Sequence, residues 1–183
     1  ISFFEQSLAI SRAIGDTAGE EKNLRELGMA HNKLGDSQRA LAFFEQAAAT
    51  AGKVFGSIGE ERAKSHLGPA YALLGKTQQA VDSLELALAS ARQSGDQRFE
   101  GATLNNLASC YLMLGKPEQT IEACEQALTI ARKIGDRRGE GYALSNLGDA
   151  YTALHNPQQA IELLEQALTC SREAEDRACE GNI

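Results

Sequence analysis

The chain has 183 residues, of which 43% are hydrophobic and 23% are charged, and its formal net charge at pH 7 is −7. Proteins that bind a nucleic-acid backbone usually carry a basic surplus, so 25 acidic against 18 basic residues argues against that class of partner. No apolar run approaches the roughly 18 residues that a bilayer-spanning helix needs, and no signal-peptide pattern opens the chain. We therefore expect a cytoplasmic protein with neither a nucleic-acid nor a membrane partner.

The sequence repeats itself every 40 residues, and such a period has to be recognised before any single element is assigned. The clearest columns of the period are Leu27, Leu67, Leu107 and Leu147; Leu34, Leu74, Leu114 and Leu154; Glu45, Glu85, Glu125 and Glu165; and Ala47, Ala87, Ala127 and Ala167. A fixed period of this length is typical of a linear array in which each unit contacts only its neighbours.

Each unit contains two runs of apolar residues at steps of three and four, which predict two amphipathic helices, A and B, joined by a short turn. A unit of this kind is a helical hairpin. In chain order we predict a lone helix B at 1–14, complete hairpins at 16–54, 56–94, 96–134 and 136–174, and the start of a further helix A at 176–183.

The residues at the expected helix starts agree with these assignments. Asp16, Asp96 and Asp136 stand where helix A needs an N-cap. Pro117 and Pro157 stand in the first turn of helix B, where a missing N–H costs no hydrogen bond. Both signals place the two helices of a hairpin at the same points of the period.

Small residues recur at one place on each helix, which predicts a close approach of the two backbones. These residues are Gly28, Gly68, Ala108 and Gly148 on helix A, and Ala40, Ala80, Thr120 and Ala160 on helix B. Glycine inside a helix costs about 1 kcal/mol relative to alanine, so its recurrence needs a steric reason. We expect that reason to be closure of the hairpin.

The second repeat departs from the others. Ser57 replaces the N-cap aspartate and forms a capping-box pattern with Glu60. Lys64 replaces a leucine, and Pro69 lies inside helix A. Because a proline removes one hydrogen bond of the helix and clashes with the carbonyl four residues back, we expect a kink near Ser65. The irregularity of this repeat has two equally open explanations: sequence drift that the array tolerates, and a bend that serves a function.

The signature Leu147, Gly148, Tyr151, Ala160, Leu164 and Ala167, which the other units largely share, resembles the tetratricopeptide repeat. The 40-residue unit, with Gly-Asp before helix A and SNLG within it, is similar to LGN/Pins-like scaffolds and to bacterial arrays of the same repeat. The resemblance implies an all-α fold, a right-handed superhelical solenoid of antiparallel helical hairpins. It also implies a concave groove, lined by helices A, that binds a peptide of another protein.

In that fold certain positions of helix A face the groove, and they give the candidate peptide-binding residues. These are Lys22, Arg25, Arg62, His66, Asn105, Asn106, Tyr142, Asn146 and Asp149. A column of amides can bind the main chain of a peptide irrespective of its sequence, since each amide donates and accepts. The alternative is that the asparagines only solvate a helix face.

Charge varies along the predicted groove. Lys22, Arg25 and Arg62 gather in its first two repeats, and Tyr142 and Asp149 lie in its last. An acidic stretch of the ligand should therefore prefer the N-terminal half, where charge complementarity would set register and association rate. Coincidence is a serious alternative, because surface Lys and Arg are common.

No pattern for catalysis, metal binding or a cofactor is present. The three histidines lie at unrelated phases of the repeat, and the cysteines show neither zinc-site nor disulfide spacing. Cys110 and Cys124 lie on apolar stripes, which favours small buried side chains over nucleophiles. We expect a non-enzymatic interaction scaffold. The alternative is a structural or sensory array that acts on an effector domain outside this segment.

Both ends of the chain cut through a repeat. The helix B at 1–14 lacks its helix A, and 176–183 starts a helix A that lacks its helix B. Solenoids normally protect their ends with polar capping units. The hypothesis that follows is end-to-end self-association of the segment.

Overall fold

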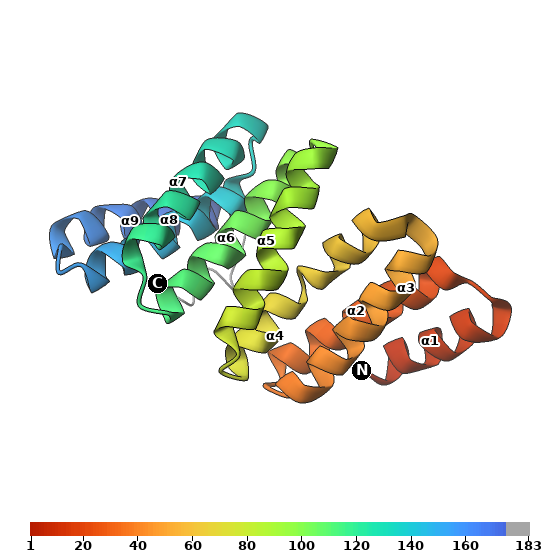
Figure 1. Ribbon diagram of the computed structural model, residues 1–183. Helices are drawn as coiled ribbons and strands as arrows, with labels where there is room; N and C mark the ends of the chain where they lie inside the picture. The colour runs from red at the N-terminus through yellow and green to blue at the C-terminus, as the bar shows by residue number, and fades with distance from the viewer. Residues whose placement is uncertain (175–183) are drawn as a thin grey trace. The chain divides into compact units, whose positions relative to one another are not determined.

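The computed structural model describes residues 1–174. The side chains of Phe55, Ser57, Ile58, Glu61, Arg62, Pro69 and Leu73 lie outside this description, as does the helix start expected at 176–183. Every regular element among the described residues is an α-helix (Figure 1). The helices are α1 (Ser2–Ile14), α2 (Thr17–Lys33), α3 (Ser37–Lys64), α4 (Leu67–Leu73), α5 (Thr77–Ser94), α6 (Gln97–Met113), α7 (Pro117–Ile134), α8 (Arg137–Ala153) and α9 (Pro157–Glu173).

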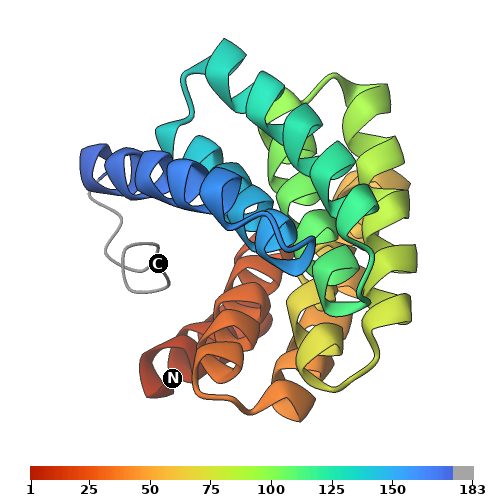
Figure 2. The ribbon, with the colours of Figure 1, turned by 90° about the vertical axis from the view of Figure 1, so that its left-hand side faces the viewer.

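The chain forms two compact units, Ile1–Ser90 and Ala91–Ile183, and α5 crosses from one to the other. Consecutive helices pair within each unit: α2 lies beside α3, α6 beside α7, and α8 beside α9 (Figures 1 and 2). None of the described helices is both long and apolar enough to cross a lipid bilayer.

In the first unit, α1 packs against α2, and α2 against α3. Leu8, Leu24, Leu27 and Ala47 bring the three helices together in one buried cluster. The side chain of Asp16 accepts a hydrogen bond from the backbone N–H of Gly19 at 2.9 Å. The N-cap predicted for α2 is therefore confirmed.

Two breaks in the helical path lie at the start of the second repeat and within its first helix. Gly56 breaks the helical path inside α3 with φ 70° and ψ −164°, and α3 ends at Lys64, three residues before α4 begins at Leu67. Pro69 has no N–H for the carbonyl of Ser65, so the regular i→i−4 pattern fails at this point. The kink expected near Ser65 is confirmed. The capping box expected at Ser57 lies outside the described side chains.

In the second unit, α6 packs on α7, α7 on α8, α8 on α9, and α6 on α8. Asp96 and Asp136 cap α6 and α8 through backbone N–H groups three residues on, at 3.0 Å in both cases. Pro117 and Pro157 occupy the first turns of α7 and α9. All four of these helix-start predictions are confirmed.

The recurring glycines of helix A lie where the two helices of a hairpin approach closely. A Cβ built on Gly28 would lie 2.5 Å from the ring of Phe44, and one built on Gly148 would lie 2.7 Å from Cγ of Leu164. In the third repeat, Ala108 takes the place of the glycine and Cys124 that of the large side chain. The predicted steric reason for the glycines is confirmed, and one repeat uses an alternative combination of sizes.

An arginine and a glutamate eight residues apart form an ion pair at several of the joins between one hairpin and the next. We call these contacts junction pairs: Arg12–Glu20 at 2.7 Å, Arg92–Glu100 at 3.0 Å and Arg132–Glu140 at 2.9 Å. At the join between the first and second repeats, Gly52 stands where the arginine would be, and Glu60 of the second repeat pairs with Lys64 of its own helix at 2.7 Å. The second repeat thus departs from the others in its ion pairing as well as in its backbone.

Candidate peptide-binding cleft

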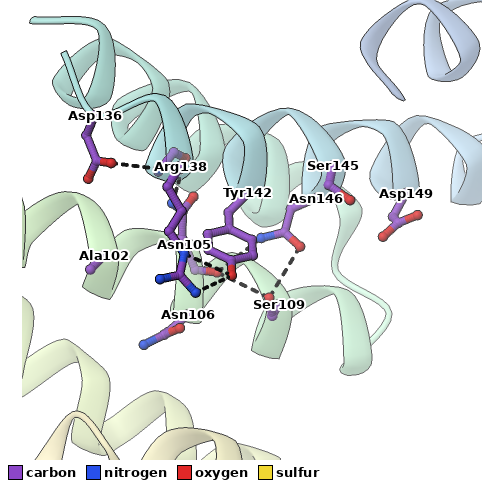
Figure 3. Close-up of a pocket in the computed structure, with 11 residues that line it drawn as sticks. Ala102, Asn105, Asn106, Ser109, Asp136, Arg138, Tyr142, Ser145, Asn146 and Asp149 are labelled. Atoms are coloured by element: carbon purple, nitrogen blue, oxygen red, sulfur yellow. Dashed lines mark hydrogen bonds between the residues drawn. The ribbon is translucent and has the colours of Figure 1, made fainter. Parts of the chain in front are cut away.

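A cleft of ≈ 730 Å³ lies in the second unit between α6 and α8 (Figure 3). It is lined from α6 by Ala102, Asn105, Asn106 and Ser109, and from the start and body of α8 by Asp136, Arg138, Gly139, Tyr142, Ser145, Asn146 and Asp149. Both helices are the first helices of their hairpins. The 40-residue period therefore places Asn106 and Asn146 at equivalent points of the two walls.

Hydrogen bonds of the Asn105 and Asn146 side chains tie α6 to α8 along the cleft. Asn146 donates from Nδ2 to the backbone carbonyl of Asn105 at 3.2 Å, and its Oδ1 accepts from Ser109 Oγ at 3.3 Å (Figure 3). Asn105 donates from Nδ2 to the carbonyl of Gly139 at 3.0 Å. Two of the predicted amides thus hold the walls of the cleft together.

Part of this polar lining lacks an intramolecular partner. Asn105 is only 7% exposed, and its Oδ1 is buried without a hydrogen bond. A buried acceptor that is left unsatisfied costs about 1–3 kcal/mol. Asn106 is half-buried and, among the described residues, its side chain makes no hydrogen bond within the chain. The cleft therefore contains amide groups with hydrogen-bonding capacity to spare.

Charged side chains lie toward the two ends of the α8 wall. The guanidinium of Arg138 donates to the hydroxyl of Tyr142 at 3.1 and 3.3 Å and lies 5.5 Å from the centroid of its ring. Asp149 is exposed as a whole residue, but partial burial of its carboxylate raises the pKa by desolvation. In Figure 3 the side chain of Asn146 lies between these two residues.

The predicted site residues fall into two groups. Those that line the cleft are Asn105, Asn106, Tyr142, Asn146 and Asp149. Lys22, Arg25 and His66 belong to the first unit and do not line it, and the side chain of Arg62 lies outside the described residues.

Two of the first-unit candidates, Arg25 and His66, are already engaged with their surroundings. The guanidinium of Arg25 lies 3.4 Å from the carboxylate of Glu21 and 3.6 Å from that of Glu26. The ring of His66 stacks on Phe44 with centroids 5.9 Å apart. Because two carboxylates offset the charge of Arg25, an acidic ligand would have to displace them. The preference of an acidic ligand for the N-terminal half of the chain stays a prediction.

Ser109 and Arg138 line the cleft but were not among the candidate peptide-binding residues. Ser109 lies one helical turn after Asn105, and its hydroxyl also donates to the carbonyl of Asn105 at 3.2 Å. Arg138 lies one turn before Tyr142, and an exposed arginine near a helix start gives little signal on its own. Two clues were available: Ser109 lies at the same phase of the 40-residue period as Asp149, and both residues lie four positions from a chosen candidate.

The described residues give little support for nucleophilic catalysis or metal binding. Burial raises the pKa of Cys110 to about 11 and, together with Glu125 and Asp149, that of Cys124 to about 12, so both stay thiols at neutral pH. Both are buried, as predicted. No three His, Cys, Asp or Glu side chains within residues 1–174 are grouped to hold a metal ion.

The fold resembles several solved structures of helical repeats. The TPR-like repeats of a putative kinesin light chain from Podosopora anserina share 25% identity with the chain, with 96% of this chain and 87% of that chain covered and a TM-score of 0.67. BtubC (BKLC) from P. vanneervenii matches at 18% identity over 96% of this chain and 73% of that chain, with a TM-score of 0.76. The TPR domain of Arabidopsis FLU matches at 20% identity over 65% and 99%, with a TM-score of 0.59. The last two, at these identities, show the fold alone.

The sequence itself identifies the family. No protein of curated function matches it. A model of the tetratricopeptide repeat matches residues 20–93, 58–119 and 99–173. Proteins of this family are generally non-catalytic scaffolds for protein–protein interaction, and the narrower likeness to LGN/Pins-like scaffolds stays a prediction. The predicted all-α class is confirmed, and the chain belongs to the tetratricopeptide repeat family.

Proposed function

We propose that the chain binds an extended peptide segment of a partner protein in the cleft between α6 and α8. The observation that carries the proposal is the cleft itself, ≈ 730 Å³ in volume and lined by amides from consecutive repeats. Ligand sites in proteins typically have about 300–1,000 Å³ and a few convergent polar groups. Amides suit a peptide main chain, because each one donates and accepts.

The hydrogen bonds across the cleft do not prevent such binding. The bond from Asn146 Nδ2, at 3.2 Å, lies at the long end of the usual N–H···O range. The exposed contact from Ser109 Oγ to Asn146 Oδ1, at 3.3 Å, is longer than the usual O–H···O range. A ligand can exchange these bonds for its own at little net cost, since the number of bonds is preserved. Asn106 needs no such exchange, and its amide is the first point of contact that we expect for a peptide.

The test is a selection of phage-displayed random linear peptides on the immobilised chain. Enriched peptides are then measured against wild type, Asn106→Ala and Gln166→Ala. Gln166 is an exposed amide on α9 and provides the matched control. Loss of one or two hydrogen bonds should weaken binding roughly fivefold to thirtyfold in Asn106→Ala and leave Gln166→Ala unchanged.

Asn106→Ala should keep the wild-type melting temperature, because its side chain makes no hydrogen bond within the described chain. A loss of binding then reports the cleft and not unfolding. If no peptide is enriched, or if enriched peptides bind Asn106→Ala as tightly as wild type, the cleft is not the binding site.

A second candidate function is association with another copy of the chain through α1. Phe3, Ile10 and Ile14 form a stripe on α1 and are 76%, 61% and 71% exposed. The equivalent of Ile10 in α7 is Ile130, whose Cγ2 would lie 3.3 Å from a Cβ built on Gly101 of α6. The face that a helix A covers in a complete hairpin is thus open on α1 among the described residues.

We propose that residues 176–183 of a second copy, which repeat the sequence of a helix A start, cover this stripe. Light scattering over a concentration series should show oligomers for wild type and monomers for Ile10→Glu. A wild-type chain that stays monomeric at every concentration would remove the idea.

A further inference from the structure

The two ends of the α6–α8 cleft carry opposite charges. Arg138 lies near the start of α8 and Asp149 near its end, about three helical turns or about 16 Å apart along the axis. Asn146 and Ser109 lie between them in Figure 3. The neutral middle of the cleft is thus flanked by a cation on one side and an anion on the other.

Arg138 is held in a defined position. Its two hydrogen bonds to the Tyr142 hydroxyl and its place over the Tyr142 ring restrict the long side chain before any ligand arrives. Prior restriction reduces the side-chain entropy that binding has to remove. A guanidinium presents five N–H donors in a planar fork, a geometry that matches a carboxylate.

The neighbouring Asp136 acts at the start of the helix. Its Oδ1 accepts the N–H of Gly139 at 3.0 Å as the N-cap of α8. In Figure 3 the side chain of Arg138 runs away from Asp136, along Tyr142 and toward Asn106. A ligand carboxylate would therefore meet the guanidinium on the side of the cleft.

Asp149 provides the opposite end. Desolvation raises its pKa, so its ionised form is less favourable there than in open water. A cation placed beside such a carboxylate stabilises its ionised form and offsets part of the cost of desolvation. The end of the cleft at Asp149 therefore favours a lysine or arginine of a ligand.

We propose that the cleft selects extended segments that carry one acidic and one basic side chain about five residues apart, the acid at Arg138 and the base at Asp149. An extended chain advances about 3.3 Å per residue, so five residues span the roughly 16 Å along α8 between the backbone positions from which Arg138 and Asp149 project. This inference rests on the proposed function, because it names the ligand of the same cleft.

The experiment repeats the phage selection on three proteins: wild type, Asp149→Lys and Arg138→Glu. Wild type should enrich peptides with an acid and a base about five residues apart. Asp149→Lys makes both ends basic and should enrich peptides with two acids at that spacing. Arg138→Glu makes both ends acidic and should enrich peptides with two bases.

Synthetic peptides of the three charge patterns then give dissociation constants by fluorescence anisotropy. The matched pattern should bind each protein roughly threefold to tenfold more tightly than the mismatched ones. This preference should shrink as salt is raised, since exposed charge pairs are screened. Both substituted residues are exposed, so equal melting temperatures confirm that the comparison concerns the ligand alone.

The outcomes separate the two proposals. Peptides that depend on Asn106 but show the same charge pattern, or none, on all three proteins would overturn the inference and leave the proposed function standing. If no peptide is enriched on any of the proteins, the proposed function fails and the inference fails with it.

Discussion

Replacing Gly148 with alanine tests whether hairpin closure depends on a missing side chain. The new Cβ would lie 2.7 Å from Cγ and 2.8 Å from Cδ2 of Leu164, and 3.4 Å from the carbonyl oxygen of Ala160. Because the nearest atom is the branch point of Leu164 and not its tip, the whole side chain has to move. Overpacking of this kind costs about 1–3 kcal/mol, while alanine returns about 1 kcal/mol of helix propensity. We expect a net loss of about 1 kcal/mol.

The third repeat supplies the compensating change. Ala108 and Cys124 occupy the positions of Gly148 and Leu164 there, and both are buried. Leu164→Cys alone should destabilise by leaving a void. The double variant Gly148→Ala with Leu164→Cys should be more stable than the sum of the single effects by about 1–2 kcal/mol, because the added methyl group fills the space that leucine leaves.

Gly141 on the same helix is the matched control. A Cβ built there would lie 3.4 Å from Cβ of Cys170, which is an ordinary contact. Gly141→Ala should therefore stabilise by up to about 1 kcal/mol. Urea unfolding followed by far-UV circular dichroism gives the free energies, provided that all variants share one m-value. If Gly148→Ala stabilises as much as Gly141→Ala, or if the double variant is strictly additive, the packing explanation is wrong.

Three further outcomes follow from the fold. Burial would raise the pKa of Glu140, but hydrogen bonds from Arg132 and Arg137 outweigh it and lower the pKa. The ionised Glu140 side chain therefore stabilises the folded chain above the ordinary pKa of glutamate, and this stabilisation is lost as pH falls through the lowered value. Wild type should melt at a higher temperature than Glu140→Gln at pH 7, and the difference should disappear below about pH 4. Cys124, with its pKa of about 12, should escape iodoacetamide at pH 8 in the native chain and react in urea, as peptide mapping would show. Pro69→Ala returns an N–H to the helix and should slow hydrogen exchange in α4, with a gain of up to about 3 kcal/mol; unchanged exchange would mean that the break has another cause.

Features that depend on neighbours within one hairpin could be predicted from the sequence. The caps at Asp16, Asp96 and Asp136 require only an acceptor three residues before a backbone N–H. The break near Ser65 required only that Pro69 lacks a donor. Such features need no knowledge of how helices from different repeats pack, and the structure confirms them.

Features that depend on contacts between repeats were less accessible. Asn105 and Asn146 were expected to point at a ligand, but their Nδ2 groups bond to the backbone of the neighbouring repeat. The pairing of Arg25 with Glu21 could have been anticipated from the four-residue spacing, whereas Arg138 needed the position of Tyr142 in space. A column of equivalent residues shows which side chains share a face. It does not show which of these side chains are already occupied by hydrogen bonds within the fold.

The junction pairs have a consequence for how such an array changes its length. Each pair takes its arginine from the end of one 40-residue unit and its glutamate from the start of the next. A unit that is duplicated or excised in step with the period takes with it the glutamate at its start and the arginine at its end. Where both residues are present, the new joins form complete ion pairs without any compensating substitution. The join at Gly52 is the exception, because it lacks the arginine: excision of 56–95 would bring Gly52 against Glu100 and remove the Arg92–Glu100 pair. Recombination within a gene can therefore lengthen or shorten the protein and keep an ion pair at every join whose units supply both the arginine and the glutamate.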